Sequence, residues 1–330
     1  MSSALGARDL FRLVRNGIDV KAVHAHTRKP FRFLLCGDPG LIAELRALLL
    51  SGHDNGVVPF DAAACLETIP ANAPLITEPT EVRVVIFLGR RGDLDGAMLE
   101  PLKALRVPIL AITVDPSAQP SGPASPPAPA AFAEYVVPAI TKEALRGRVF
   151  LHIVDVSKSV EIAIGRRLPP MRETVAAKLT RDAANNALKV ALASAVVDHI
   201  PIVGVVLGAF ASAGDMVAIT GLQMMLLLQI QAAYGKDPDV QRMWQLLPVI
   251  GGGLGWRTLA RELVGFVPVA GIAIKGAIAY AGTIVVGEGV TFFLEHGQPM
   301  SKGQAKAIYD RTKDDALRFA RDVMTRFKKS

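Results

Sequence analysis

LVGFVPVAGIAIKGAIAYAGTIVVG, residues Leu263 to Gly287, is the stretch that decides how this chain is organised. A helix needs about 20 mostly apolar residues to cross a bilayer, and this run reaches that length with one charged interruption, Lys275. A second apolar block, Leu188 to Ala233, precedes it and contains IPIVGVVLGAFASAG and MMLLLQI. We therefore expect residues 187–297 to form an all-α, strongly apolar, membrane-associated domain.

Charged residues interrupt both apolar blocks. An ionised side chain in the middle of a membrane helix costs about 2.5 to 3.5 kcal/mol, so it normally faces a partner or a wet cavity. We expect Asp215 and Lys275 to form such a polar pair. Alternatively, Asp215 and Lys275 line a polar path together with Asp198 and His199, which would indicate a transport or pore-like function.

Small residues recur in this region at spacings that allow close helix packing. In lipid, small residues let helix backbones approach and associate. The candidate packing positions are Gly204, Gly208, Gly251, Gly255 and Gly271. A tightly packed soluble helical bundle shows the same pattern, and the charges of residues 234–262 leave the number of membrane spans open.

The composition favours a lipid partner. The net charge is +7, which suits anionic headgroups or nucleic acid. With only 4 Tyr and 2 Trp and no basic-aromatic motif, we expect anionic membrane lipids and no nucleic acid. Cys36 and Cys65 form no disulfide framework, and the N-terminus lacks the apolar core of a signal peptide. These features predict a location at the cytoplasmic membrane.

The first part of the chain alternates apolar runs with helical segments. The expected strands are Phe31 to Cys36, Val82 to Leu88, Val107 to Val114 and Glu134 to Ile140. Continuous apolar strands between helices indicate a parallel sheet that is covered on both faces. We predict an α/β domain over residues 29–140 on the cytoplasmic side, after an amphipathic segment 1–28 and with a Pro/Ala-rich loop at 116–133.

Two helical segments flank the apolar region. Residues 141–186 are expected to form a helical connector, and residues 298–330 a basic amphipathic helix. The apolar stripe of the C-terminal helix is Ile308, Ala316, Phe319, Ala320, Val323 and Phe327. This helix either lies on an anionic membrane surface or covers the soluble domain.

Several motifs follow one another in a fixed order in the C-terminal half. They are RRLPPMR (Arg166 to Arg172), NNA (Asn185 to Ala187), HIPIVG (His199 to Gly204), LQMMLLLQIQAAYG (Leu222 to Gly235), GGGLGWRTLARE (Gly251 to Glu262) and FVPVAG (Phe266 to Gly271). This part resembles the YcjF-type domain-of-unknown-function membrane family, whose helical domain follows Era-type GTPase domains. The resemblance implies a membrane-associated helical domain over roughly residues 160 to 297.

The first 140 residues resemble the GTPase-like domain that precedes this helical domain. Asp115 is the remnant of the guanine-specificity motif, and Gly37 and Gly40 are remnants of the phosphate loop. A working phosphate loop also needs a Lys and a Ser or Thr, but Ala43 and Glu44 stand at those positions. The resemblance therefore implies a degenerate, P-loop GTPase-like domain that lacks catalysis.

Other reactive residues form no recognisable site in the sequence. His24 and His26 have no third ligand nearby, so a metal site is not expected. Asp38, Asp54 and Asp115 could imitate a phospho-acceptor pocket, but no suitably placed Lys supports it. We assign no catalytic residue, no cofactor and no metal.

The leading hypothesis is a non-catalytic, membrane-associated scaffold or regulatory protein with a pseudoenzyme GTPase-like domain. It would self-associate or bind a protein partner. The alternatives are transport through Asp215 and Lys275, and a nucleotide hydrolase with an unconventional pocket at Asp115.

Overall fold

The computed structural model describes residues 19–69, 81–90, 102–103, 105–119, 121, 132–193, 215–239 and 271–327. The chain divides into two compact units. One comprises Ala25–Lys178 with Ala233–Gly235 and contains the sheet; the other comprises Met1–His24, Leu179–Ala232 and Lys236–Ser330. The division falls inside one long helix, so the segment 141–186 belongs partly to each unit.

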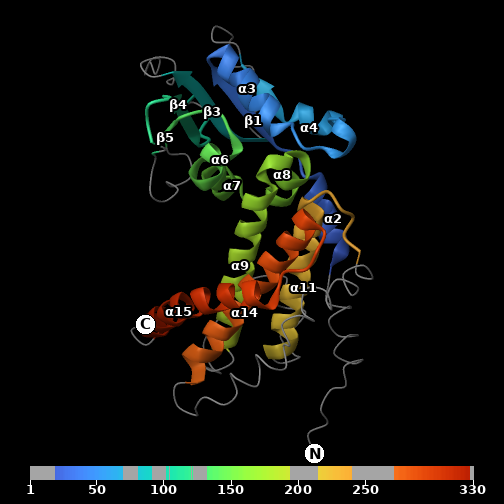
Figure 1. Cartoon of the computed structure of the whole chain (residues 1–330), viewed down its shortest axis with the longest axis vertical. Coiled ribbons are helices and arrows are strands. Elements are labelled where there is room, and N and C mark those ends of the chain that lie inside the picture. Colours follow the sequence, from blue (N-terminus) through green and yellow to red (C-terminus); the bar gives the residue numbers. More distant parts are fainter. Residues whose placement is uncertain are drawn as a thin grey trace, which may run out of the picture. The chain divides into compact units, whose positions relative to one another are not determined.

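Five parallel strands form one sheet in the order β2-β1-β3-β4-β5 (Figure 1). They are β1 (Arg32–Gly37), β2 (Leu66–Thr68), β3 (Val82–Arg90), β4 (Ile109–Val114) and β5 (Phe132–Val137). Every neighbouring pair is parallel. The expectation of a parallel α/β sheet is thus confirmed. Its central strands are mostly apolar because side chains on both faces are buried.

One strand, β2, was missing from the sequence expectation, and the start of β5 was placed too late. Strand β2 has only three residues, too few to show an apolar run of its own. Strand β5 begins at Phe132, inside the Pro/Ala-rich segment, because Phe132 pairs in register with Ile109 of β4. Both differences come from pairing with a neighbouring strand, which local sequence does not reveal.

Short helices complete the sheet-containing unit. They are α3 (Pro39–Leu49), α4 (Phe60–Ala64), α6 (Lys142–Leu145), α7 (Leu151–Val156) and α8 (Glu161–Arg167), with the short helical segments η1 (Asp54–Gly56), η3 (Arg146–Phe150) and η4 (Pro169–Met171). Helix α2 (Val20–Arg28) is divided between the two units at Ala25. Helix α3 packs on β1 and β3, and α7 also contacts β3. Leu34, Phe87 and Ile109 belong to a buried cluster on one face of the sheet, which Leu102 completes.

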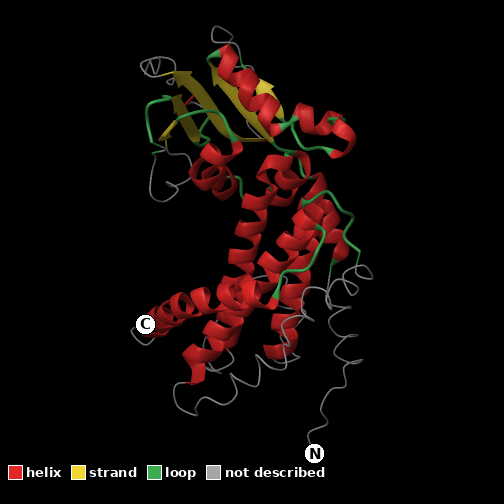
Figure 2. Cartoon of the chain, viewed as in Figure 1, coloured by secondary structure: helices red, strands yellow, loops and turns green. Residues whose placement is uncertain are grey.

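Long helices dominate the second unit. The chain contributes α9 (Arg172–Ala193), α11 (Asp215–Ala233), α14 (Gly271–His296) and α15 (Lys302–Phe327). Among the described residues after Val137 there are only helices, turns and loops (Figure 2). Within the part of the chain that the structure describes, Gly276–His296 is the one helix long and apolar enough to cross a membrane, and 56% of its most apolar window is buried.

Helix α14 extends beyond the apolar run that the sequence suggested. It continues past Gly287 through Val290 and Leu294 and ends at His296. Gly297 then adopts a φ of +69°, and its N–H donates to the Phe293 carbonyl at 2.8 Å. A glycine in this left-handed conformation is a common helix terminator.

Helix α15 packs against α14. Ala305 and Tyr309 are buried in a cluster with Ala281 and Val285, and Ala316 is buried as well. The sequence left open whether the apolar stripe of α15 meets a membrane or covers the soluble domain. In its described part the stripe covers α14. Phe319, Ala320, Val323 and Phe327 have side chains outside the described residues.

Candidate functional site

The carboxyl edge of the sheet is where an α/β protein of this strand order places its ligand. The connections run from β1 to β2 on one side and from β2 back to β3 on the other, so the order reverses between β1 and β3. Ligands of such sheets bind in the crevice beyond the carboxyl ends of the strands at this switch point. Gly37, Asp38 and Arg90 lie there.

Gly37 makes a close backbone contact at this point. Its φ is +112°, and a Cβ on this residue would lie 1.9 Å from the carbonyl oxygen of Leu88. The next N–H, that of Asp38, donates to the same carbonyl at 2.8 Å. The loop after β1 is therefore held tightly against β3, and only glycine fits.

Asp38 occupies the N-terminus of α3. Its Oδ1 accepts from the Leu41 N–H at 2.9 Å, and its Oδ2 lies 3.7 Å from Nε of Arg90. Pro39, the first residue of α3, has no N–H to offer. The position where a phosphate would meet the helix N-terminus thus holds the chain's own carboxylate, which disfavours a second anion.

The other motif remnants, Gly40 and Asp115, lie along the same edge. The structure places Gly40 in α3, where its backbone lies close to Asp38 Oδ1. Asp115 follows β4, and its Oδ1 accepts from the Ser117 N–H at 3.0 Å and from Ser117 Oγ at 2.6 Å. Asp54 lies beyond the far end of α3, away from Asp38. No cluster of three or more potential metal ligands occurs among the described residues.

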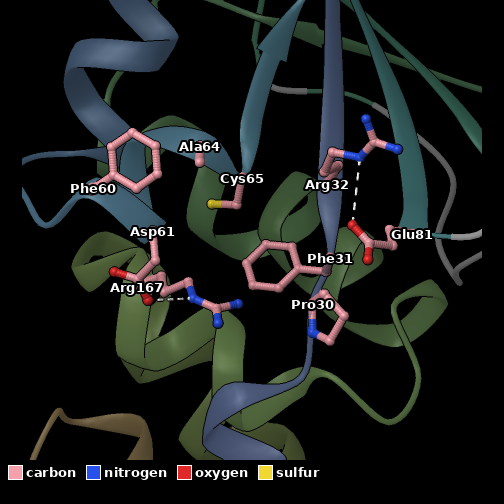
Figure 3. A pocket seen from close by; sticks show the side chains of 9 residues that line it. All are labelled: Pro30, Phe31, Arg32, Phe60, Asp61, Ala64, Cys65, Glu81 and Arg167. Atoms are coloured by element: carbon pink, nitrogen blue, oxygen red, sulfur yellow. Dashed lines mark hydrogen bonds and ion pairs between the residues drawn. The ribbon is translucent and has the colours of Figure 1, made fainter. Parts of the chain in front are cut away.

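A cavity opens at the opposite, amino edge of the sheet (Figure 3). Its volume is about 530 Å³. It is lined by Pro30, Phe31, Arg32, Phe60, Asp61, Ala64, Cys65, Glu81 and Arg167. No sequence pattern indicated this cavity, because its walls come from segments more than 100 residues apart.

Arg167 organises one side of the cavity. Its Nε donates to Asp61 Oδ2 at 2.8 Å, and its Nη1 donates to the Lys29 carbonyl at 2.9 Å. The guanidinium carbon also lies 5.3 Å from the centroid of the Phe31 ring. These contacts join α8 to the start of β1 and to α4. Through these contacts the Arg167 guanidinium binds other groups of the chain and has a structural role.

The cysteine of the cavity is not an activated nucleophile. Burial raises the pKa of the Cys65 thiol to about 12, and its Sγ donates to the Ala62 carbonyl. The thiolate is the reactive form of cysteine, so a thiol with so high a pKa is inert near neutral pH. Burial raises the pKa of Cys36 to about 12 as well.

An exposed apolar tip borders the cavity. Phe60 is 89% exposed and Val57 is 70% exposed, with Val58 between them 39% exposed. These are the large apolar side chains that the described part of the chain leaves most open to water, apart from Phe132. A cluster of exposed apolar side chains beside a cavity is typical of a surface that binds another molecule.

The expected membrane pair and packing glycines fall mostly outside the described residues. Asp215 begins α11 and Lys275 lies in α14, but their side chains are not described. Gly204, Gly208, Gly251 and Gly255 are outside the described residues, and Gly271 is known only as the first residue of α14.

Two glycines that the sequence patterns did not single out make the close helix contacts instead. A Cβ on Gly276 would lie 2.6 Å from Leu188, and a Cβ on Gly287 would lie 2.1 Å from Oγ1 of Thr180. Both partners belong to α9. The two glycines are about three helical turns apart and so share one face of α14. That spacing is the signal that could have identified them.

A buried histidine lies behind β5. His152 Nδ1 is 2.6 Å from the Tyr135 hydroxyl, and both side chains are almost fully buried. Within the described residues Nε2 of His152 has no hydrogen-bond partner. Burial lowers the pKa of His152 from 6.5 to about 4.

The sheet-containing unit is therefore expected to lose stability as the pH falls from about 6.5 to 4. In this range the unfolded chain binds a proton at His152 that the folded state does not, so the loss reaches about 3 kcal/mol. Amide hydrogen exchange across this pH range, corrected for the intrinsic rate, measures it. In the double variant Tyr135→Phe/His152→Phe the pH dependence should become shallower. An unchanged pH dependence would show that His152 is not its source, leaving His26 and His53, whose pKa values burial also lowers.

The chain was also compared with known proteins. No protein-family model, no curated protein and no solved structure matches it. The fold and the geometry of the sites described above are therefore the grounds on which a function can be argued.

Proposed function

We propose that this chain is a non-catalytic, membrane-associated scaffold or regulatory protein, and that its sheet-containing unit is a degenerate GTPase-like domain. The observation that carries the proposal is the carboxylate of Asp38 at the N-terminus of α3. A nucleotide-binding α/β domain keeps this position for phosphate. Here the capping hydrogen bond to Leu41 and the ion pair with Arg90 use it for the chain itself.

The chemistry of the remaining described groups supports a role without catalysis. Phosphoryl transfer depends on cations that neutralise the phosphates and on a bound metal. Arg90, a cation at this edge, lies beside Asp38, and Asp115 accepts two hydrogen bonds from Ser117. In the amino-edge cavity Arg167 is bound to Asp61 and to Lys29.

Protein contact is the activity that we assign to the sheet-containing unit. The tip formed by Val57, Val58 and Phe60 offers apolar area that the unit does not bury itself. Membrane association is assigned to the helical unit. It is supported by the length and composition of Gly276–His296 and by the net charge of +7, which favours anionic lipid.

Nucleotide binding tests the first part of the proposal. The full chain is titrated with a fluorescent GTP analogue and Mg²⁺, beside the variants Asp38→Asn and Asp115→Ala. We expect no saturable binding and no turnover by the wild type. Asn caps a helix about as well as Asp, so Asp38→Asn removes the charge while keeping the cap. Phosphate affinity that emerges in this variant alone would identify the carboxylate as the excluding group.

The contrary result is equally specific. GTP or ATP turnover by the wild type that disappears in Asp115→Ala would establish an unconventional hydrolase and overturn the non-catalytic assignment. The membrane part is tested separately by ultracentrifugation of the full chain with carbonate extraction. A chain that stays wholly in the supernatant without detergent would contradict membrane association.

A further inference from the structure

Helix α14, which could cross a membrane, is packed against other helices of the same unit. On one side Gly276 and Gly287 lie against Leu188 and Thr180 of α9. On the same face, between these two glycines, Thr283 Oγ1 accepts a hydrogen bond of 3.2 Å from the side-chain amide of Gln223 in α11. In this conformation 56% of the most apolar window of α14 is buried by neighbouring helices.

Helix α15 closes a further side of α14. After the turn at Gly297, α15 packs against α14, and Ala305 and Tyr309 lie in one buried cluster with Val285 and Ala281. Nη2 of Arg311 lies 3.6 Å from Oε1 of Glu288, which adds an ion pair between the two helices. The contacts involve Ala281, Val285 and Glu288, which lie within the stretch of α14 that is apolar enough to cross a bilayer.

The outer face of α15 is strongly charged. Lys306, Asp310, Arg311, Asp315 and Arg318 all have side chains that are half or more exposed. Charged side chains within the hydrocarbon layer are strongly unfavourable unless they face a partner or water. Helix α14 cannot enter a bilayer while α15 lies along it, because these charges would enter with it.

The contact between α14 and α15 is also suited to opening. The ion pair between Arg311 and Glu288 is exposed to solvent, where such pairs contribute little. The interface buries the small side chains of Ala305 and Ala316. The Tyr309 hydroxyl is buried without a hydrogen-bond partner among the described residues, which weakens the contact further.

We propose that α15 is a strap that shields α14, and that α14 enters an anionic lipid bilayer only after α15 has left it. The inference rests on the membrane association proposed above and adds its regulation. Release would expose Ala305, Tyr309 and Ala316, which are buried now, beside a charged face on which Lys302, Lys306, Arg311, Lys313 and Arg318 outnumber Asp310, Asp314 and Asp315. Basic residues on an amphipathic helix favour binding to anionic headgroups.

A cross-link between the two helices tests the strap. In the full chain, the double variant Glu288→Cys/Arg311→Cys is treated with a short bismaleimide, which joins two positions whose native side chains already meet. The matched control is the same variant capped with N-ethylmaleimide, which carries the same substitutions without the link. The native Cys36 and Cys65 are buried and have pKa values of about 12, so they react slowly. The wild type treated with bismaleimide checks this.

Both proteins are mixed with vesicles of equal parts phosphatidylglycerol and phosphatidylcholine and then extracted with carbonate. We expect the capped protein to resist extraction and the cross-linked protein to be retained at least tenfold less. Equal or greater retention of the cross-linked protein would overturn the strap but leave membrane association standing. If neither protein is retained, membrane association itself fails, and the strap fails with it.

Discussion

Gly37→Ala is expected to destabilise the sheet-containing unit by at least about 3 kcal/mol. An L-residue at a φ of +112° is strained, at a cost of about 1 to 3 kcal/mol. The added Cβ would also lie 1.9 Å from the Leu88 carbonyl oxygen, so β1 and β3 would have to separate. Hydrogen exchange of the amides in β1 and β3 should report the loss directly, because it measures local opening free energies.

Two alanine controls separate the causes. Gly56 has a φ of +68°, but no atom lies within 4 Å of the position that a Cβ would take there, so Gly56→Ala measures the backbone strain alone. Gly40→Ala adds a methyl in α3, where the nearest atom is Asp38 Oδ1 at 3.1 Å, and should change stability by less than about 1 kcal/mol. If Gly37→Ala costs no more than Gly56→Ala, the close contact with Leu88 does not exist.

Gly287→Ala is expected to destabilise the helical unit by about 3 kcal/mol, although alanine favours a helix over glycine by about 1 kcal/mol. The new Cβ would lie 2.1, 2.4 and 2.8 Å from Oγ1, Cγ2 and Cβ of Thr180. All three atoms belong to a buried side chain on α9, so the helices must move apart, and overpacking of this kind costs about 1 to 3 kcal/mol or more. Hydrogen exchange in α9 and α14 is the measurement.

A second substitution on α9 provides the decisive control. Thr180→Gly removes the three atoms that the added methyl group would meet, so the double variant Gly287→Ala/Thr180→Gly should recover much of the lost stability. The coupling energy of this double-mutant cycle should be favourable by at least about 1 kcal/mol. Gly303→Ala in α15 is the matched reference, because nothing lies within 4 Å of its Cβ position, and it should be neutral or stabilising. Additive effects at Gly287 and Thr180 would contradict the contact.

The functional assignment depends on two features that point the same way. The Asp38 carboxylate caps α3 at the carboxyl edge of the sheet, where it disfavours phosphate. At the amino edge, Val57, Val58 and Phe60 are exposed apolar side chains. On these two features we base the proposal that the domain binds a partner and does not catalyse a reaction. In our proposal, release of α15 from α14 would then control when α14 enters a lipid bilayer.

Much of the sheet could be predicted from local sequence. The runs at β1, β3 and β4 are mostly apolar, and β5 follows as a recognisable apolar segment. Helix α3 and the charged helix α15 were visible from their periodicity. Strand β2 could not be found, because its three residues become a strand only by pairing with β1.

The candidate site was predictable only in part. Gly37, Gly40 and Asp115 were identified as motif remnants, but the sequence could not show that Asp38 caps α3 or that Leu88 lies against Gly37. The cavity at the amino edge was invisible, since Phe31, Asp61 and Arg167 meet only in the folded chain. Gly276 and Gly287 were overlooked in favour of glycines at shorter spacings.

Periodicity and the length of apolar runs were enough to identify most strands and helices, and to show that the C-terminal half contains a helix apolar enough for a membrane. These local properties could not show that α9, α11 and α15 enclose this helix. Hydrophobic burial is not directional, so lipid and a neighbouring helix stabilise an apolar side chain in the same way. Long-range packing makes the choice between them, and it is visible only in the folded chain.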